Sequence, residues 1–192
     1  KADGYINSDA SVKTAEYLNE FIKNGYANLD PVKDEFLNGK AATLLGGSWN
    51  IADLEKSNLN WGVSYFPVAD DGKAASPTGD WAAAITKDSK NPDAAGKFLQ
   101  WAMNSDNIAS YASAVAKPAS RTSSYEKMEG WDSGARALMK WQLQNTGVSR
   151  PRTPSYSVLS TDFSTAMLNI FSGSNAKDEL DNVAKNFDEN YE

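Results

Sequence analysis

The residues best suited to chemistry in this sequence are a glycine pair followed by a serine and a tryptophan, Gly46-Gly47-Ser48-Trp49. Two glycines remove side-chain bulk where a ligand must approach the backbone closely. The tryptophan adds a flat, rigid apolar face with one N–H donor. The combination suits a pocket for a small polar ligand that has apolar faces, such as a sugar. The alternative is a core tryptophan after an ordinary strand-to-helix turn, which the glycines only shape.

A second candidate group follows Gly79. Asp80 offers a carboxylate that can accept hydrogen bonds from two adjacent sugar hydroxyls, and Trp81 offers another aromatic face. The alternative is a turn aspartate and a half-buried strand tryptophan.

Three further side chains lie in or beside proline-containing loops: Arg121, Arg152 and Tyr156. An arginine can direct its forked donors at hydroxyls or a carboxylate. For each arginine, a solvated surface position is the simpler explanation. Tyr156 either lines a cleft or packs beneath the next helix.

The composition excludes most catalytic chemistry. The chain has no histidine and no cysteine, which removes Ser-His-Asp chemistry, thiol catalysis, disulfides and the commonest metal ligands. Adjacent carboxylates occur at Asp34–Glu35, Asp70–Asp71 and Asp188–Glu189. Neighbours in sequence point in different directions, so none of these pairs suits glycoside hydrolysis. A DxDxDG calcium loop is also absent. We expect no catalytic residue, no metal and no cofactor.

Length, charge and hydropathy limit the class of protein. The 192 residues are 41% hydrophobic, enough for a core in one or two domains. A net charge of −6 does not support a basic face for nucleic acid. No apolar run approaches the roughly 20 residues that span a bilayer. The chain begins at Lys1 and has no signal peptide, so we expect a processed or excised piece of a longer protein.

The elements predicted in the first half of the sequence surround the glycine–tryptophan segment. Asn7 or Ser8 can cap a first helix, which Gly25 ends. A short helix over 31–37, a buried strand over 41–45 and a helix over 49–56 follow. Alternation predicts strands over 61–68 and 81–86, with a turn at 70–72 and a loop over 73–78 between them.

The second half is predicted to be mostly helical. Asn91 and Pro92 start a helix whose buried face is Ala95, Phe98, Leu99 and Ala102. Further helices begin at Ser105, at Asp132 or Ser133, before the apolar stripe from Leu159 to Ile170, and at Ser174 as a cap. Strands separated by helices indicate an α/β fold that is rich in helix.

The order of these elements resembles a known family. Five segments match its motifs in the same order: Phe36-Leu-Asn-Gly-Lys-Ala-Ala-Thr-Leu-Leu-Gly-Gly-Ser-Trp49, Trp61-Gly-Val-Ser-Tyr-Phe-Pro67, Thr78-Gly-Asp-Trp-Ala-Ala-Ala-Ile85, Ser89-Lys-Asn-Pro-Asp-Ala-Ala95 and Arg150-Pro-Arg-Thr-Pro-Ser-Tyr156. Each motif is weak alone, but together they span nearly the whole chain. The chain resembles the C-terminal half of an extracellular solute-binding protein of a bacterial ABC importer, in the maltose-binding-protein-like carbohydrate group.

The resemblance implies a periplasmic-binding-protein-like type II fold with two lobes, of which this chain is the C-terminal portion. Residues 1–78 and 122–192 would belong to the C-terminal lobe, and residues 79–121 would cross to the other lobe. Trp49 would lie in the cleft and stack on a sugar ring. Gly47, Ser48, Asp80, Trp81, Arg121, Arg152 and Tyr156 would complete this chain's share of the cleft.

The implied function is non-catalytic capture of a sugar or oligosaccharide between two closing lobes. The implied partners are the carbohydrate, the membrane permease and the missing N-terminal half. The implied location is extracytoplasmic, in the periplasm or lipid-anchored at the outer face of the membrane. Three alternatives remain open: another solute such as a polyamine, peptide or anion; a carbohydrate hydrolase; and a cell-surface interaction domain.

Overall fold

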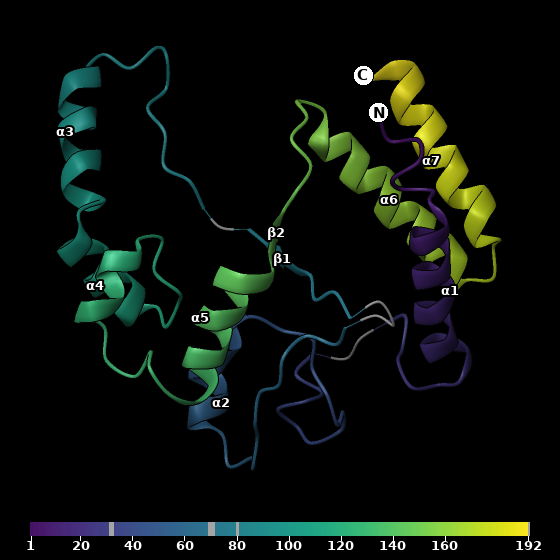
Figure 1. The fold of residues 1–192 in the computed structure, drawn as a ribbon, viewed down its shortest axis with the longest axis horizontal. Helices are drawn as coiled ribbons and strands as arrows, with labels where there is room; N and C mark the ends of the chain where they lie inside the picture. Colours follow the sequence, from purple (N-terminus) through teal and green to yellow (C-terminus); the bar gives the residue numbers. More distant parts are fainter. Residues whose placement is uncertain (31–32, 69–71, 80, 192) are drawn as a thin grey trace. The chain divides into compact units, whose positions relative to one another are not determined.

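The computed structural model describes residues 1–30, 33–68, 72–79 and 81–191. The chain contains two compact units. Unit 1 comprises residues 1–33 and 151–192, and unit 2 comprises residues 34–150. Figure 1 labels the helices and strands of both units.

Unit 1 is built from three packed helices, α1 (Asp9–Lys23), α6 (Tyr156–Phe171) and α7 (Ala176–Asn190). Figure 1 shows α6 and α7 side by side, with α1 next to them. Ser8 caps α1 by accepting a hydrogen bond from the Ser11 N–H, as predicted. The cap of α7 is Asn175, whose side chain accepts the Asp178 N–H, so the prediction of Ser174 was wrong by one residue.

The core of unit 1 lies between the apolar faces of these helices. Its buried residues are Ala2, Ala15, Leu159, Ala166, Ile170, Ala176, Leu180, Val183, Ala184 and Phe187. The predicted inward face of α7 is therefore confirmed. The carboxylate of Asp188 holds the N-terminal segment against α7. It accepts hydrogen bonds from the Ala2 N–H (N–Oδ1 2.6 Å) and the Asp3 N–H (N–Oδ2 3.1 Å). The Ala2 hydrogen bond is the main reason that the pKa of Asp188 is lowered.

The first part of unit 2 contains less regular structure than the sequence predicts. Residues 33–40 form turns in place of the predicted helix, whose residues 31 and 32 lie outside the described part. Asp34 has a φ of 60°, a left-handed conformation that does not continue a helix. Gly72 has a φ of +71°, while the other two residues of the predicted turn at 70–72 are not described.

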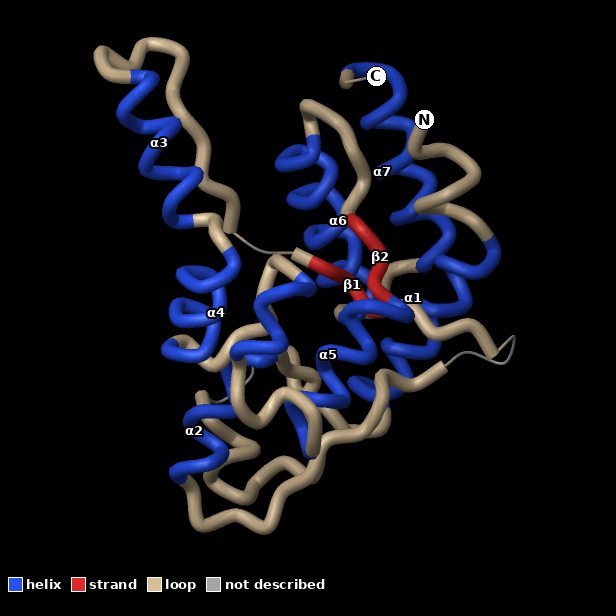
Figure 2. Tube along the Cα trace, turned by 60° about the vertical axis from the view of Figure 1, so that its left-hand side comes forward, coloured by secondary structure: helices blue, strands red, loops and turns tan. Residues whose placement is uncertain are grey.

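The three predicted strands at 41–45, 61–68 and 81–86 have no regular secondary structure and do not form a sheet, and residues 42–45 are exposed. Backbone N–H and C=O groups of a strand need a neighbouring strand, and the described residues supply none at these positions. The sheet within the described part of unit 2 has two short parallel strands, β1 (Ser76–Thr78) and β2 (Gly147–Ser149). Figure 2 shows them in red, side by side.

The other elements of unit 2 are η1 (Ser48–Asn50), α2 (Ile51–Lys56), α3 (Pro92–Ala102), α4 (Ser105–Ala114), η2 (Thr122–Lys127) and α5 (Gly134–Thr146). The predicted starts at Asn91, Pro92 and Ser133 are confirmed. A buried cluster joins α4 to the segment around η2: Ile108, Ala109, Ala112, Ala119, Met128 and Trp131.

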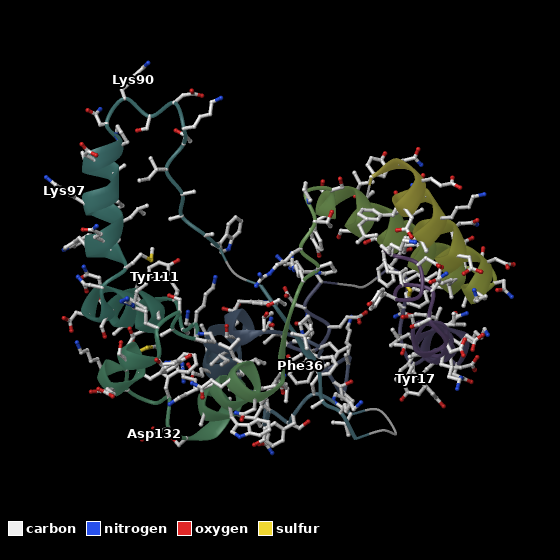
Figure 3. All side chains as sticks on the ribbon, turned by 45° about the horizontal axis from the view of Figure 1, so that its top comes forward. Tyr17, Phe36, Lys90, Lys97, Tyr111 and Asp132 are labelled. Atoms are coloured by element: carbon white, nitrogen blue, oxygen red, sulfur yellow. The ribbon has the colours of Figure 1, made fainter. Side chains whose placement is uncertain are left out.

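The prediction of a buried face on α3 was wrong. No residue of α3 is buried, and Phe98 is 60% exposed. None of the described elements of unit 2 covers the rings of Phe98 and Trp101, which lie 5.8 Å apart. Lys90 and Lys97 are labelled along this part of the chain in Figure 3. The helix therefore has an amphipathic sequence without a buried side.

Candidate functional site

Trp49 lies on the surface of unit 2, with 66% of its area exposed, so it is not a core residue. Its six-membered ring lies directly over the backbone of Gly47. A Cβ built on Gly47 would be 2.2 Å from the Trp49 Cζ3 and 2.4 Å from Cη2. Gly47 has an extended backbone (φ −134°, ψ −177°) that any residue can adopt. Glycine is therefore required here for space and not for backbone conformation.

Asn50 closes the same turn, and the sequence reasoning did not single it out. The Gly47 N–H donates to the Asn50 Oδ1 over 3.1 Å, and the Asn50 N–H donates to the Gly47 carbonyl over 3.0 Å. A Cβ on Gly46 would lie 2.5 Å from the Asn50 Oδ1. An asparagine three residues after a glycine was the available signal, since asparagine side chains often bond to nearby backbone groups.

Helix α2 anchors this turn to the rest of unit 2. Ile51 and Leu54 are buried. Glu55 accepts two hydrogen bonds from the Arg136 guanidinium on α5, with Nη1–Oε1 and Nη2–Oε2 distances of 2.5 and 2.9 Å. The hydrogen bond from Arg136 lowers the pKa of Glu55, and the same bond raises the pKa of Arg136. Two buried apolar side chains and a bidentate ion pair thus hold the helix that directly follows the Trp49 turn.

The parallel strands end beside each other, and their carboxyl ends form a second candidate position. The register pairs Thr78 with Ser149, so Gly79 and Arg150 follow the two strands at the same edge. A Cβ on Gly79 would be 3.1 Å from the Arg150 Nη2. Ligands of open α/β sheets bind outside the carboxyl ends of strands. Arg152 was the predicted site residue of this loop, whereas Arg150 lies beside Gly79; the arginines on either side of Pro151 were the available signal.

The remaining predicted residues are spread over the two units. Asp80 lies outside the described residues, and Trp81 is 89% exposed in the segment after β1. Arg121 is exposed at the residue that precedes η2. Arg152 is exposed and Tyr156, the first residue of α6, is half-buried, both in unit 1. Within unit 2, the structure therefore brings Gly47, Ser48 and Trp49 into one turn.

A shallow cavity lined by polar and charged residues lies on unit 1, and none of the predicted site residues is among them. Its lining is Asp3, Asn7, Asp181, Asn182, Lys185, Asp188 and Glu189. Asp181 binds Lys177 and Asn7, and these hydrogen bonds lower its pKa. Asp188 binds the N-terminal backbone. These carboxylates are already used in contacts that hold unit 1 together.

The described residues contain no group of three or more metal-ligating side chains that could hold an ion. Among the helices in the described part of the chain, none combines the length and the apolar character needed to cross a bilayer.

Comparison with known proteins gives consistent matches. A family model described as "Bacterial extracellular solute-binding protein" matches residues 1–139. Maltodextrin-binding protein MdxE of Bacillus subtilis (strain 168) is 23% identical over 97% of this chain and 48% of its own length. The galactooligosaccharide-binding protein of the same organism is 26% identical over 53% of this chain and 26% of its own length.

Among solved structures, the crystal structure of the cyclic α-maltosyl-1,6-maltose binding protein from Arthrobacter globiformis matches with a TM-score of 0.73. It is 20% identical, and the match covers 94% of this chain and 48% of that one. The chain thus spans about half the length of the relatives that it matches.

These matches confirm the predicted fold class, a helix-rich part of a periplasmic-binding-protein-like fold. The family's description as extracellular indicates an extracytoplasmic location. Because the family model covers well over half of the residues, the chain belongs to the bacterial extracellular solute-binding protein family.

Proposed function

We propose that this chain forms part of a protein that captures an oligosaccharide without altering it and delivers it to an ABC importer. The observation that supports this most directly is the exposed indole of Trp49, held over the bare backbone of Gly47. The relatives named as maltodextrin- and galactooligosaccharide-binding proteins support the same ligand class.

The geometry suits a sugar for a physical reason. The C–H faces of a pyranose ring are apolar and pack on an aromatic plane, while its hydroxyls need polar partners. Ser48 precedes Trp49 in the same turn, and its hydroxyl is such a partner. We propose Gly47, Ser48, Trp49, Asp80, Trp81, Arg121, Arg152 and Tyr156 as this chain's contribution to the binding cleft.

We propose a non-catalytic mechanism. The ligand enters between two lobes, closure about a hinge buries it, and the permease recognises the closed form. The absence of histidine and cysteine from the sequence removes the commonest bases and nucleophiles. The protein would work in the periplasm or attached by a lipid to the outer face of the cell membrane.

The proposed cleft needs a second half. Residues 1–78 and 122–192 would form the C-terminal lobe, and residues 79–121 would cross to the other lobe. The uncovered apolar face of α3 supports this division, since an amphipathic helix normally buries its apolar side. The N-terminal half of the solute-binding protein would cover that face and complete the cleft.

Titration calorimetry of the complete solute-binding protein against a panel of sugars and other small solutes tests the function. The panel would contain maltotriose, galactobiose, spermidine, a short peptide and citrate. We expect saturable binding of at least one oligosaccharide and recovery of that oligosaccharide unchanged. Preferential binding of spermidine, the peptide or citrate would contradict the ligand class. Release of shorter sugars by the pure protein would contradict the non-catalytic mechanism.

A further inference from the structure

We propose that Asn50 is a positioning residue for ligand binding, which holds the Trp49 indole in a stacking orientation before the ligand arrives. The proposal concerns a residue that does not itself contact the ligand. It rests on the proposed function for its ligand readout, and on the local geometry of the Gly46–Asn50 turn for the rest.

The first observation is a pair of hydrogen bonds that closes this turn. Both backbone polar groups of Gly47 are bonded to Asn50: the N–H to its side-chain Oδ1 at 3.1 Å and the carbonyl to its backbone N–H at 3.0 Å. Ser48 and Trp49 are the two residues between these anchors. The backbone that carries the indole is therefore fixed at both ends.

The second observation is that the side chains of Asn50 and Trp49 fill the space left by the missing Cβ atoms of Gly46 and Gly47. The Asn50 amide occupies the space that a Cβ on Gly46 would take, at 2.5 Å from its Oδ1. The Trp49 ring occupies the space that a Cβ on Gly47 would take, at 2.2 Å from Cζ3. Each side chain thus lies against one glycine, and the amide holds the backbone on which the ring rests.

The third observation is the position of Asn50 in the helical turn that carries Trp49. Asn50 is the third residue of η1, which has Gly47 at its N-cap position, and it also directly precedes α2. Its Oδ1 accepts the N–H of the N-cap residue, as the third residue of a capping box does, and makes no cap bond to α2. The side chain of Asn50 therefore stabilises the turn that carries Trp49.

The consequence concerns affinity. An exposed tryptophan that is free to rotate loses that freedom when a ligand stacks on it, and the loss weakens binding. A ring that the turn already holds loses less. Removing the Asn50 acceptor should therefore weaken binding by about three- to tenfold without any loss of direct contact.

Three variants test this in the complete protein: Asn50→Ala, Asn50→Asp and Asn60→Ala. Aspartate keeps an acceptor oxygen at the same position. Asn60 is an exposed asparagine in the loop after α2 and is the matched control. The protein is labelled with 5-fluorotryptophan, and the Trp49 resonance is assigned by its loss in Trp49→Phe. Maltotriose affinity is measured on the same samples, and circular dichroism verifies folding.

We expect Asn50→Ala to shift or broaden the Trp49 fluorine resonance and to weaken maltotriose binding three- to tenfold, while the other two variants stay within twofold of wild type. An unchanged Trp49 resonance in Asn50→Ala would overturn the positioning role. Failure of Asn50→Asp to restore the resonance would overturn it as well. If wild type binds no oligosaccharide, the proposed function fails, and the fluorine spectra alone then decide the role of Asn50.

Discussion

Arg136 on α5 donates hydrogen bonds to both carboxylate oxygens of Glu55 on α2 and forms a bidentate ion pair with it. Glu55 lies on the helix that directly follows the Trp49 turn, so this pair links the candidate site to α5. The Arg136 side chain is 26% exposed and that of Glu55 is 44% exposed. The planar guanidinium of arginine can donate two parallel hydrogen bonds to a carboxylate, which the ammonium group of lysine cannot do.

We predict that Glu55→Gln lowers the free energy of unfolding by about 0.5–1 kcal/mol, because the pair is bidentate but partly solvated. The measurement is urea denaturation at low salt. Glu20→Gln is the control, since it removes a more exposed pair with Lys23 on α1. An equal loss of unfolding free energy in both variants would show that the bidentate geometry adds no stability.

Acid should weaken the attachment of the N-terminal segment to α7. The pKa of Asp188 is lowered by the Ala2 N–H, so its contribution is complete above the ordinary aspartate pKa of about 3.9 and disappears as the pH falls through the folded value. We predict that wild type loses stability on acidification below about pH 4 more steeply than Asp188→Asn. Thermal melting at a series of pH values measures this. Asp132→Asn, at an exposed carboxylate labelled in Figure 3, is the control substitution.

Trp49→Ala should reduce oligosaccharide affinity by about five- to thirtyfold, since stacking and apolar contact together are worth roughly 1–2 kcal/mol. The melting temperature should hardly change, because the side chain is 66% exposed. Calorimetric titration measures the affinity. Tyr17→Ala, which removes an equally exposed aromatic ring on α1, should leave affinity unchanged. Wild-type affinity in Trp49→Ala would remove the leading site assignment.

Gly47→Ala should disturb the site although its backbone conformation is ordinary. The new methyl group would overlap the Trp49 ring, so the indole must leave its position or the turn must open. We predict at least a fivefold loss of ligand affinity, about 1 kcal/mol. Gly62→Ala is the matched control, because nothing lies within 4 Å of a Cβ at that position. Equal affinity in the two variants would contradict the contact between Gly47 and Trp49.

Leu180→Ala should destabilise unit 1 strongly. Leu180 on α7 is 0% exposed within the core cluster. Truncating such a leucine costs about 2–5 kcal/mol. Leu168→Ala on α6 is the control, since that side chain is 57% exposed and should cost well under 1 kcal/mol. Denaturation monitored by helical circular dichroism distinguishes the two.

Local sequence signals were enough to predict most of the helices. Ser8 as a cap, Asn91 with Pro92 as a start and the stripe from Leu159 to Ile170 act through bonds and contacts within one or two helical turns. The same applies to the glycine–tryptophan turn, whose existence was predicted from its residue types. The motif order was also enough to indicate the family.

Only the tertiary structure decided how the extended segments and exposed side chains are arranged. A strand needs a partner that lies elsewhere in the chain, so segments 41–45 and 61–68 could look like strands in sequence and remain unpaired, while β1 and β2 pair across about 70 residues. The contacts of Trp49 with Gly47, of Asn50 with Gly46, and of Arg150 with Gly79 depend on where backbones pass each other, which composition and spacing do not specify. Side-chain burial likewise depends on neighbouring elements, which is why the apolar pattern of α3 predicted a buried face that unit 2 does not provide.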